Sequence, residues 1–326
     1  MGDKVNYIVL DLEWNQCPEG KEKEKKQLPF EIIEIGAVKL NDKMEVLHTF
    51  HRVIKPQIYK QIHFRTKEVI HMEAEDLKNG VPFEEAARSF IKWCGKEYTF
   101  CTWGSMDLVE FQRNLKFYKL SYLIKSPGKY YDIQKIFSIY FEDGRSRKNL
   151  EYAVGFLNIE KDHTFHRAFE DAFYTSMIMK YMDPLVFKKN YSIDFFNNPK
   201  TRKDEIYVVY EGYSKFISKE FKDKELAMAD REVVSTRCYQ CNKNARKKIR
   251  WFTSNTKLYY CLAYCEEHGF IKGTISMKKA ENGNVFCVKK IKLIDDQETK
   301  MLQEKREMLR EKKRIKKRKL RVDLKV

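Results

Sequence analysis

An apolar run leads directly into two acidic side chains near the beginning of the sequence. Residues 7–10 (YIVL) have the character of a buried strand, and Asp11 and Glu13 follow with only Leu12 between them. Alternate residues of a strand point to the same face, so the two carboxylates project together and repel each other unless a cation lies between them. The pattern predicts either a solvated strand end or a pair of hard oxygen ligands for Mg²⁺ or Mn²⁺.

Strand and helix patterns alternate after this run. Residues 30–40 (FEIIEIGAVKL) and 44–54 predict two further strands, which can form an antiparallel meander with the first. Apolar residues at helical spacing predict a helix over 83–94. We therefore expect a mixed α/β domain over residues 1–185. Its remaining elements are predicted as one strand and four helices, at 98–103, 106–118, 130–141, 147–157 and 168–182.

Three more candidate residues occur at predicted helix starts. Asp107 lies in the first turn after a strand-to-helix reversal, and His166 and Asp171 form an H-x4-D arrangement at the start of the last predicted helix. Each has a simple structural explanation on its own, because the helix dipole favours acids at N-termini and a nearby histidine is often a surface residue. Together with the D-x-E of the first strand they form a more specific pattern.

This combination resembles the DEDDh family of 3′–5′ exonucleases, which belongs to the RNase H-like superfamily. The resemblance covers residues 5–183 and includes Glu31–Val38 (EIIEIGAV), which is similar to the second strand of that family. A W-G-x-x-D motif ending at Asp107 and an H-R-A-x-x-D motif ending at Asp171 resemble in particular the branch that trims histone messenger RNA and small RNAs. The implied fold is an RNase H-like mixed sheet flanked by helices.

The resemblance implies an enzyme that hydrolyses phosphodiester bonds from nucleic-acid 3′ ends and releases nucleoside 5′-monophosphates. It implies His166 as the general base, and His163 is the nearby competitor. RNA is the favoured substrate on the resemblance alone. The alternatives are a DNA 3′–5′ exonuclease and a non-catalytic nucleic-acid-binding protein on the same fold. It further implies two Mg²⁺ or Mn²⁺ ions held by four carboxylates, those of Asp11, Glu13, Asp107 and Asp171.

Three side chains are candidates for stacking on or wedging the last bases of a substrate, namely Trp14, Met72 and Trp103. Stacking on such side chains tolerates any base and contributes ~1–3 kcal/mol per base. Ordinary core packing is the alternative for Met72 and Trp103. Trp14 and the long basic loop at 15–29 depart from the family pattern, so we expect them to affect how the terminal nucleotide is held.

Four cysteines and one histidine gather late in the chain, at Cys238, Cys241, Cys261, Cys265 and His268. The first pair has the C-x2-C spacing of a zinc knuckle, and a closed structural site holds four ligands. Cys261 and Cys265 lie four residues apart on a predicted strand, which separates them by ~13 Å, too far for one ion. We therefore expect one structural Zn²⁺ held by Cys238, Cys241, Cys265 and His268. Cys261 is the alternative ligand if the segment is helical, and a metal-free module with buried thiols is the competing interpretation.

The rest of the chain divides into three predicted segments. Residues 186–236 form a linker and helical region, with a strand at 206–210 and a charged helix at 212–230. A zinc-ribbon-like module spans 237–290, and a basic helical tail spans 291–326. A disordered basic extension is the alternative for the tail.

The balance of charge indicates a polyanionic partner. The chain has 64 Lys and Arg against 47 Asp and Glu, a formal net charge of +17, which favours nucleic acid over an anionic membrane surface. The resemblance to 3′–5′ exonucleases implies that this nucleic acid is single-stranded or has a 3′ overhang. Lys243–Arg250 (KNARKKIR), followed by Trp251 and Phe252, places cations next to aromatic rings, which suits phosphates and stacked bases. A solvated module face is the competing account.

The sequence predicts a cytoplasmic protein without a membrane partner. No apolar run approaches the ~20 residues of a membrane-spanning helix. Asp11 and Glu13 interrupt the short apolar stretch near the N-terminus, so we expect no signal peptide. The eight cysteines are then expected to be reduced thiols or metal ligands.

Overall fold

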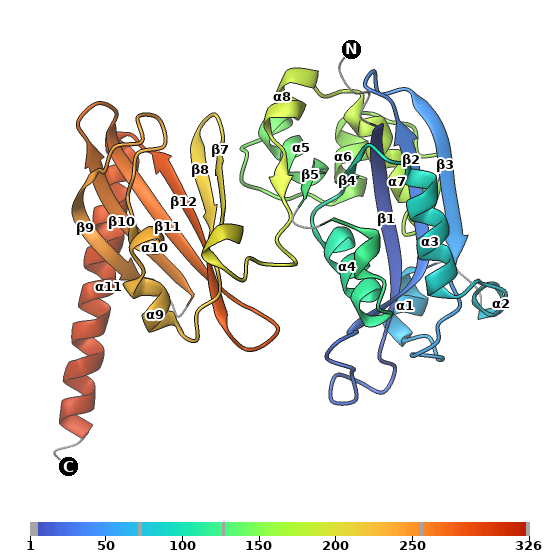
Figure 1. Ribbon diagram of the computed structural model, residues 1–326, viewed down its shortest axis with the longest axis horizontal. Coiled ribbons are helices and arrows are strands. Elements are labelled where there is room, and N and C mark those ends of the chain that lie inside the picture. Colours follow the sequence, from blue (N-terminus) through green and yellow to red (C-terminus); the bar gives the residue numbers. More distant parts are fainter. Residues whose placement is uncertain (1–5, 71–73, 126–127, 255–256, 324–326) are drawn as a thin grey trace. The chain divides into compact units, whose positions relative to one another are not determined.

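The computed structural model describes residues 6–70, 74–125, 128–254 and 257–323 (Figure 1), without the side chains of residue 74 and of residues 316–323. The chain divides into two compact units, Met1–Phe196 and Asn197–Val326. Among the described residues, no helix combines the length and the apolar character that a membrane crossing requires.

A six-stranded mixed sheet forms the centre of the first unit, in the order β3-β2-β1-β4-β5-β6 (Figure 1). The first three strands form the antiparallel meander that the sequence predicts, and β4 and β5 join it in parallel. The strands are β1 (Asn6–Gln16), β2 (Phe30–Leu40), β3 (Val46–Val53), β4 (Tyr98–Thr102), β5 (Lys129–Asp132) and β6 (Ser192–Ile193).

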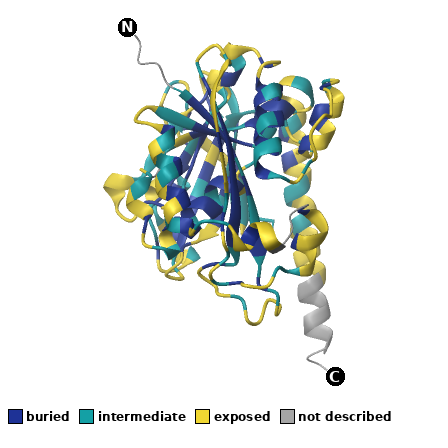
Figure 2. Cartoon of the chain, turned by 90° about the vertical axis from the view of Figure 1, so that its right-hand side faces the viewer, coloured by how far each residue is buried: buried dark blue, intermediate teal, exposed yellow. Residues whose placement is uncertain are grey.

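Helices cover both faces of this sheet, because β1 sends alternate side chains into two hydrophobic cores. Ile8 and Leu10 pack with residues of α3 and α4, whereas Tyr7 and Val9 pack with residues of α5, α6 and α7. Buried residues accordingly concentrate in the strands and on the inner helix faces (Figure 2). The helices are α1 (Phe64–Val69), α2 (Ala74–Lys78), α3 (Phe83–Cys94), α4 (Met106–Phe117), α5 (Ile133–Phe141), α6 (Leu150–Phe156), α7 (Ala168–Met179) and α8 (Pro184–Lys189), with a 3₁₀ turn η1 (Ser121–Leu123).

β1 continues beyond its two acids, in contrast to the strand end that the sequence predicts. Its pairing with β2 runs on to Gln16, with a register shift between Glu13 and Trp14. Its parallel pairing with β4 stops at Val9. Asp11 and Glu13 therefore lie on a stretch of β1 that, among the described strands, is paired on one side, with β2.

An antiparallel sheet of six strands forms the second unit, in the order β7-β8-β12-β11-β10-β9 (Figure 1). The long helix α11 packs on it through Leu302, which is buried with Ile249 and Leu262. The elements are η2 (Arg202–Asp204), β7 (Ile206–Val209), β8 (Tyr213–Ile217), α9 (Lys224–Ala229), α10 (Arg231–Val234), β9 (Arg246–Thr253), β10 (Leu258–Cys265), β11 (Gly269–Lys279), β12 (Val285–Leu293) and α11 (Asp296–Asp323).

The structure differs from the sequence prediction between 186 and 236. Where a charged helix was expected at 212–230, the chain forms β8, which pairs with β12, followed by the short helices α9 and α10. The expected linker therefore supplies two strands to the sheet that also carries the cysteines. The module expected at 237–290 is part of this larger sheet.

Two predicted boundaries also move. The first unit extends past residue 185 to Phe196, because β6 pairs with β5 and so returns the chain to the first sheet. The C-terminal helix begins at Asp296 rather than at 291, because residues 291–293 complete β12.

Candidate active site and metal centres

Three acidic side chains meet on one face of the first sheet. Asp11 and Glu13 continue the side of β1 that carries Val9, which is the side covered by α7. Helix α7 contributes Asp171 from its first turn. One carboxylate oxygen from each of the three residues lies within 4.8 Å of the other two. The sheet and the helix thus bring together acids that are far apart in the sequence.

Close packing of α7 against β2 places Asp171 near β1. Gly36 pairs with Asp11 across the β1–β2 ladder. A Cβ atom at Gly36 would collide with the backbone of Ala168 and Phe169, the first residues of α7. Because glycine has no side chain there, the start of the helix can lie directly against the strand.

A buried carboxylate in β2, that of Glu34, anchors the residues at the start of α7. It accepts hydrogen bonds from the Ala168 backbone N–H (3.1 Å) and from Arg167 Nη2 (2.8 Å), and it lies 2.6 Å from His51 Nε2. Burial opposes ionisation of Glu34, but the bonds from His51, Arg167 and Ala168 hold its pKa below the usual value. The charged carboxylate therefore ties β2 and β3 to the helix that carries Asp171.

Asp107 approaches the same acids from the first turn of α4. It is 6% exposed, and its carboxylate accepts a hydrogen bond from the backbone N–H of Leu12, the residue between the two acids of β1. Among the neighbouring charges that raise the pKa of Asp11, that of Asp107 has the largest effect. Asp107 is not one of the three residues within 4.8 Å of one another, so it lies beside that group rather than in it.

Burial and mutual repulsion make these carboxylates difficult to ionise together. Burial and the neighbouring negative charges raise the pKa of Asp11 well above its usual range and the pKa of Glu13 to about 9. Burial also raises the pKa values of Asp107 and Asp171 to about 7. Oδ1 of Asp171 is buried without a hydrogen-bond partner among the described residues. A group of hard oxygen ligands in this state fits Mg²⁺ or Mn²⁺, which would relieve the repulsion and give Oδ1 a partner.

The two candidate histidines have different surroundings. The backbone N–H of His166 donates to Asp171 Oδ2 at 3.2 Å, and its φ of 65° places it in the left-handed region, which is uncommon for residues other than glycine. The residue is exposed. The backbone N–H of His163 instead donates to the hydroxyl of Tyr174, and its ring packs against Phe173. Of the two histidines, only His166 has a described hydrogen bond to one of the three acids, and it makes this bond through its backbone N–H.

Residues 8–179 match the family model described as Exonuclease (RNase_T). The chain belongs to this exonuclease family. It is 27% identical over 179 residues to the protein named "Probable 3'-5' exonuclease KapD" of Bacillus subtilis (strain 168), a match that covers 55% of this chain and 84% of that protein. Its structure is similar to the nuclease domain of 3'hExo, a DEDDh family member solved bound to rAMP. That match has 20% identity and a TM-score of 0.50, and it covers 59% of this chain and 98% of the other.

These similarities confirm two predictions for the first unit, the nuclease class and the RNase H-like mixed α/β fold. The residues matched by the family lie wholly within that unit. They include the four acids and the two candidate histidines. The first unit is therefore called the exonuclease domain below.

Two of the three predicted substrate contacts pack within the exonuclease domain. Trp14 is half-buried and packs against the core that contains Ile8. The ring of Trp103 packs on Phe137, and its indole N–H donates to the backbone carbonyl of Lys148 at 3.2 Å. These contacts agree with the core-packing alternative for Trp103. Met72 lies outside the described residues.

Three residues that support the acidic group, Glu34, His51 and Arg167, were not predicted from the sequence. The signal for one of them was present, because Glu34 is an acid within an otherwise apolar strand pattern. A charged residue at such a position is rarely buried unless it is paired. Glu31 follows the same rule, since it is 2% exposed and accepts backbone hydrogen bonds from residues 57–59.

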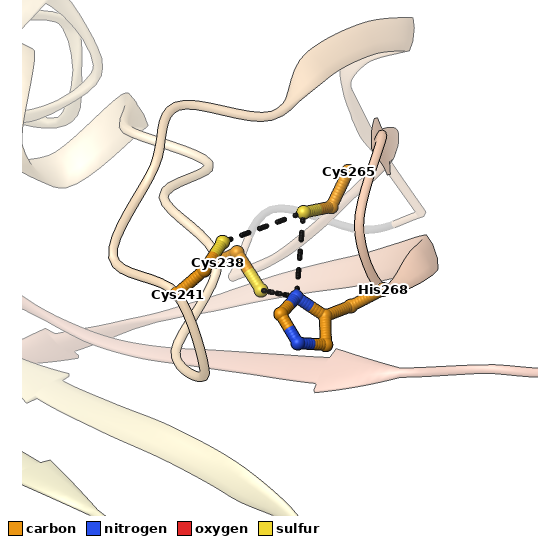
Figure 3. A group of neighbouring side chains, drawn as sticks. All are labelled: Cys238, Cys241, Cys265 and His268. Atoms are coloured by element: carbon orange, nitrogen blue, oxygen red, sulfur yellow. Dashed lines mark hydrogen bonds between the residues drawn. The ribbon is translucent and has the colours of Figure 1, made fainter.

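The second unit holds a separate group of side chains of the types that bind metal ions, shown in Figure 3. Sγ of Cys241 lies 3.6 Å from Sγ of Cys265, and Nδ1 of His268 lies 3.7 Å from the sulfurs of both Cys238 and Cys265. A tetrahedral zinc ion with bonds of about 2.3 Å to sulfur and about 2.0 Å to nitrogen separates its ligand atoms by roughly 3.5–3.8 Å. The four side chains therefore already have the spacing of a closed zinc site.

Two tight turns build this cysteine cluster, which we define as Cys238, Cys241, Cys265 and His268. In the first turn, the N–H of Asn242 donates to the carbonyl of Cys238 at 2.9 Å and folds the C-x2-C segment back on itself. In the second, Cys265 ends β10 and His268 lies just before β11. Pairing of β10 with β11 closes that turn. Each pair of ligands is thus positioned by local chain geometry.

Cys261 lies outside the cluster. β10 is a strand through Cys265, so the helical arrangement that would make Cys261 a ligand is not formed. Its side chain is fully buried in the sheet and lies next to Gly273 of β11. Cys261 is therefore a buried thiol of the sheet.

Proposed function

We propose that the exonuclease domain is a metal-dependent 3′–5′ exonuclease that releases nucleoside 5′-monophosphates, with RNA as its favoured substrate. Membership of the exonuclease family supplies the reaction class. The metal dependence is supported by the group of Asp11, Glu13 and Asp171. Their oxygens lie within 4.8 Å of one another, and one buried oxygen of Asp171 has no hydrogen-bond partner in the part of the chain that the structure describes. Like charges at this distance favour a cation between them.

The acids differ in their proposed tasks. Asp11, Glu13 and Asp171 would hold one divalent cation, and Asp11 together with Asp107 would face a second. Bound Mg²⁺ or Mn²⁺ would supply positive charge at the scissile phosphate and lower the pKa of the attacking water. The protein itself would contribute by positioning these ligands. Strand β1 and helix α7 keep three of the oxygens close together, and the Leu12 N–H orients Asp107.

We assign the general base to His166. Its backbone N–H is bonded to Asp171, and histidine is the side chain that most often takes the proton of an attacking water in general base catalysis. His166→Asn should lower kcat by about 10²- to 10⁴-fold, the usual contribution of a general base. His163→Asn in the same loop is the matched control and should retain activity. The reverse result would transfer the role to His163.

The preference for RNA rests on the likeness to the 3'hExo nuclease domain, whose structure holds rAMP. A DNA 3′–5′ exonuclease would use the same chemistry, and contacts to the 2′-hydroxyl decide between the two. A non-catalytic nucleic-acid-binding protein is the alternative from another class. The retained set of four acids argues against it.

The decisive experiment uses RNA and DNA oligonucleotides of one sequence, labelled at the 5′ end, with Mn²⁺ or Mg²⁺ and with EDTA. We expect a ladder that shortens from the 3′ end, 5′-monophosphate products, faster loss of RNA, and no reaction in EDTA. Asp11→Ala should abolish the reaction, whereas Asp42→Ala, an exposed acid in the turn after β2, should not. Wild-type hydrolysis by Asp11→Ala would refute the proposal, and faster loss of DNA would reverse the substrate assignment.

We also propose that the cysteine cluster binds one structural Zn²⁺. Protein atoms fill all four tetrahedral positions, which is typical of zinc sites that stabilise a fold rather than react. The predicted cytoplasmic location, where thiols stay reduced, is compatible with this role and stays a prediction.

A further inference from the structure

An open groove of about 960 Å³ in the second unit is lined by four cations. Arg231 comes from α10, Arg237 from the segment that leads into Cys238, and Lys247 and Arg250 come from β9. All four residues are exposed. Glu232 is the one acid among the described residues that line the groove. The groove therefore concentrates positive charge next to the cysteine cluster, at the strand that forms one edge of the sheet.

We propose that this groove binds the sugar-phosphate backbone of single-stranded nucleic acid. Arginine and lysine neutralise phosphates, and most contacts that position a protein on nucleic acid go to phosphate and sugar. The hydroxyl of Ser235 and the amide of Asn244 also line the groove and suit such contacts. The site lies outside the exonuclease domain and goes beyond the proposed hydrolysis, because binding here needs no reaction.

The walls of the groove are joined by hydrogen bonds that leave the four cations available. The indole N–H of Trp251 donates to the carbonyl of Val234 at 3.0 Å and so joins β9 to α10. The hydroxyl of Thr236 donates to the carbonyl of Ala245 at 3.0 Å, and the Ala245 N–H donates back to the carbonyl of Thr236 at 3.3 Å. A groove that is formed before binding loses little conformational freedom when its partner arrives.

The aromatic residues near the groove are used for packing. Trp251 belongs to the core that contains Ile275, and Phe252 packs with Tyr260 on the side of the sheet that contacts α11. The sequence suggested that bases stack on Trp251 and Phe252. Because both rings pack within the second unit, we do not expect base stacking in this groove. Its contribution is charge and hydrogen bonding, which predicts binding that is independent of base sequence and sensitive to salt.

A membrane surface is the other common partner of basic proteins, and the groove suits it less well. Proteins that lie on a bilayer insert apolar side chains into it. The apolar residues of the groove, among them Met228 and Trp251, instead pack into the core of the second unit. A concave strip with charged walls and recessed apolar groups matches a chain of phosphates.

The test compares two triple variants in full-length protein that also carries Asp11→Ala, in buffer without added Mg²⁺ or Mn²⁺ and without a chelator, so that hydrolysis is blocked and zinc in the cysteine cluster is not removed. The groove variant is R237A/K247A/R250A. The control is K222A/K278A/K279A, which removes the same number of charges from exposed positions that do not line the groove. Fluorescence anisotropy measures binding to a single-stranded RNA of about 20 nucleotides, longer than the site of one binding module, at several salt concentrations.

The groove variant should bind at least about 10-fold more weakly at 0.1 M salt. Its plot of log K against log salt should be shallower by about 2, because each phosphate contact on a single strand contributes about 0.7 to the slope. The control should stay within about twofold of the parent, a change typical of exposed charges. Equal weakening in both variants, or no weakening in the groove variant, would overturn the proposal.

Two further measurements keep the result interpretable. Circular dichroism and zinc content report whether each variant is folded; if the groove variant is not, Arg250→Glu alone replaces it and should also bind about 10-fold more weakly. Binding to phosphatidylserine vesicles tests the other partner. Loss of vesicle binding with unchanged RNA affinity would assign the groove to a membrane. Because Asp11→Ala protein is used, failure of the proposed hydrolysis would leave this test intact.

Discussion

The two groups of side chains that we propose to bind metal are assembled in opposite ways. The acidic group takes Asp11 and Glu13 from a central strand and Asp171 from a helix, and these meet only because α7 packs closely on the sheet. The cysteine cluster takes its ligands from two tight turns, each of which supplies a pair that is close in the sequence. The first group depends on tertiary packing, and the second depends largely on local chain geometry.

The two groups also differ in whether their charges and ligand positions are satisfied when no metal is bound. The carboxylates repel one another, and an oxygen of Asp171 has no described partner, so the acidic group is unfavourable without a cation between its members. The cysteine cluster already has tetrahedral spacing and leaves no position for a substrate. This difference supports the two proposed roles, because a site for reaction keeps unsatisfied charge, whereas a structural site is completed by its own ligands.

The largest expected effect comes from removing a ligand of the cysteine cluster. Cys238→Ser should lose zinc from about one per chain and lower the thermal midpoint of the second unit by roughly 10 °C or more, because zinc binding is coupled to folding. Elemental analysis and calorimetry measure both quantities. Cys261→Ser, which alters a buried thiol outside the cluster, is the control and should keep its zinc. Wild-type protein without zinc would end the comparison between two metal-binding groups.

Gly36→Ala tests whether the acidic group depends on packing. The added Cβ would collide with the start of α7, and displacing Asp171 by about 1 Å is enough to lower activity about 100-fold. Gly155→Ala in α6 is the control, since no atom lies within 4 Å of the new Cβ and alanine favours a helix by ~1 kcal/mol. Hydrolysis assays and zinc content should show lost activity with the cysteine cluster intact. Normal activity of Gly36→Ala would mean that the helix start is not held as described.

Without divalent metal, the stability of the exonuclease domain should fall as pH rises. Asp107 and Asp171 have folded pKa values of about 7, and Glu13 of about 9, above the ordinary 3.8 and 4.5. A carboxyl group with a raised folded pKa favours the folded state below its unfolded pKa and loses that contribution as pH rises through its folded pKa. In EDTA, the thermal midpoint should therefore decrease between pH 4 and pH 9, as these values imply.

Asp11→Asn should make this decrease smaller, because it removes one of the repelling charges. Saturating Mn²⁺ should flatten it in the wild-type protein. Identical pH dependence in wild type and Asp11→Asn would contradict the repulsion inferred for the acidic group.

The smallest expected effect concerns Glu34 as a positioning residue. Glu34→Gln keeps the shape of the side chain but loses the charge that binds Arg167, and kcat should fall by roughly 3- to 10-fold with little change in KM. Glu31→Gln is the matched control, because Glu31 is also buried but bonds to a loop rather than to α7. Calorimetry should show lower stability for both variants. Equal kcat values for both would reduce Glu34 to a structural role.

Periodic patterns predicted much of the exonuclease domain. The helix over 83–94 and the strand over 30–40 begin and end at the predicted residues, because each presents its own regular apolar pattern. The segment at 212–230 was predicted wrongly as a helix. Its first part becomes a strand only by pairing with β12, a partner far along the chain that no local pattern reveals.

Residue types and their spacing determined which side chains are candidates, and both are properties of the sequence alone. The acids were identified by their order, and Cys238 and Cys241 by the C-x2-C interval. Only the tertiary structure decided that Asp107 lies beside the group of three acids, that Glu34 anchors α7, and that the cations of α10 and β9 share one groove. The physical reason is that distances between remote residues depend on how strands pair and helices pack. A sequence pattern describes the faces of an element and does not specify its partner.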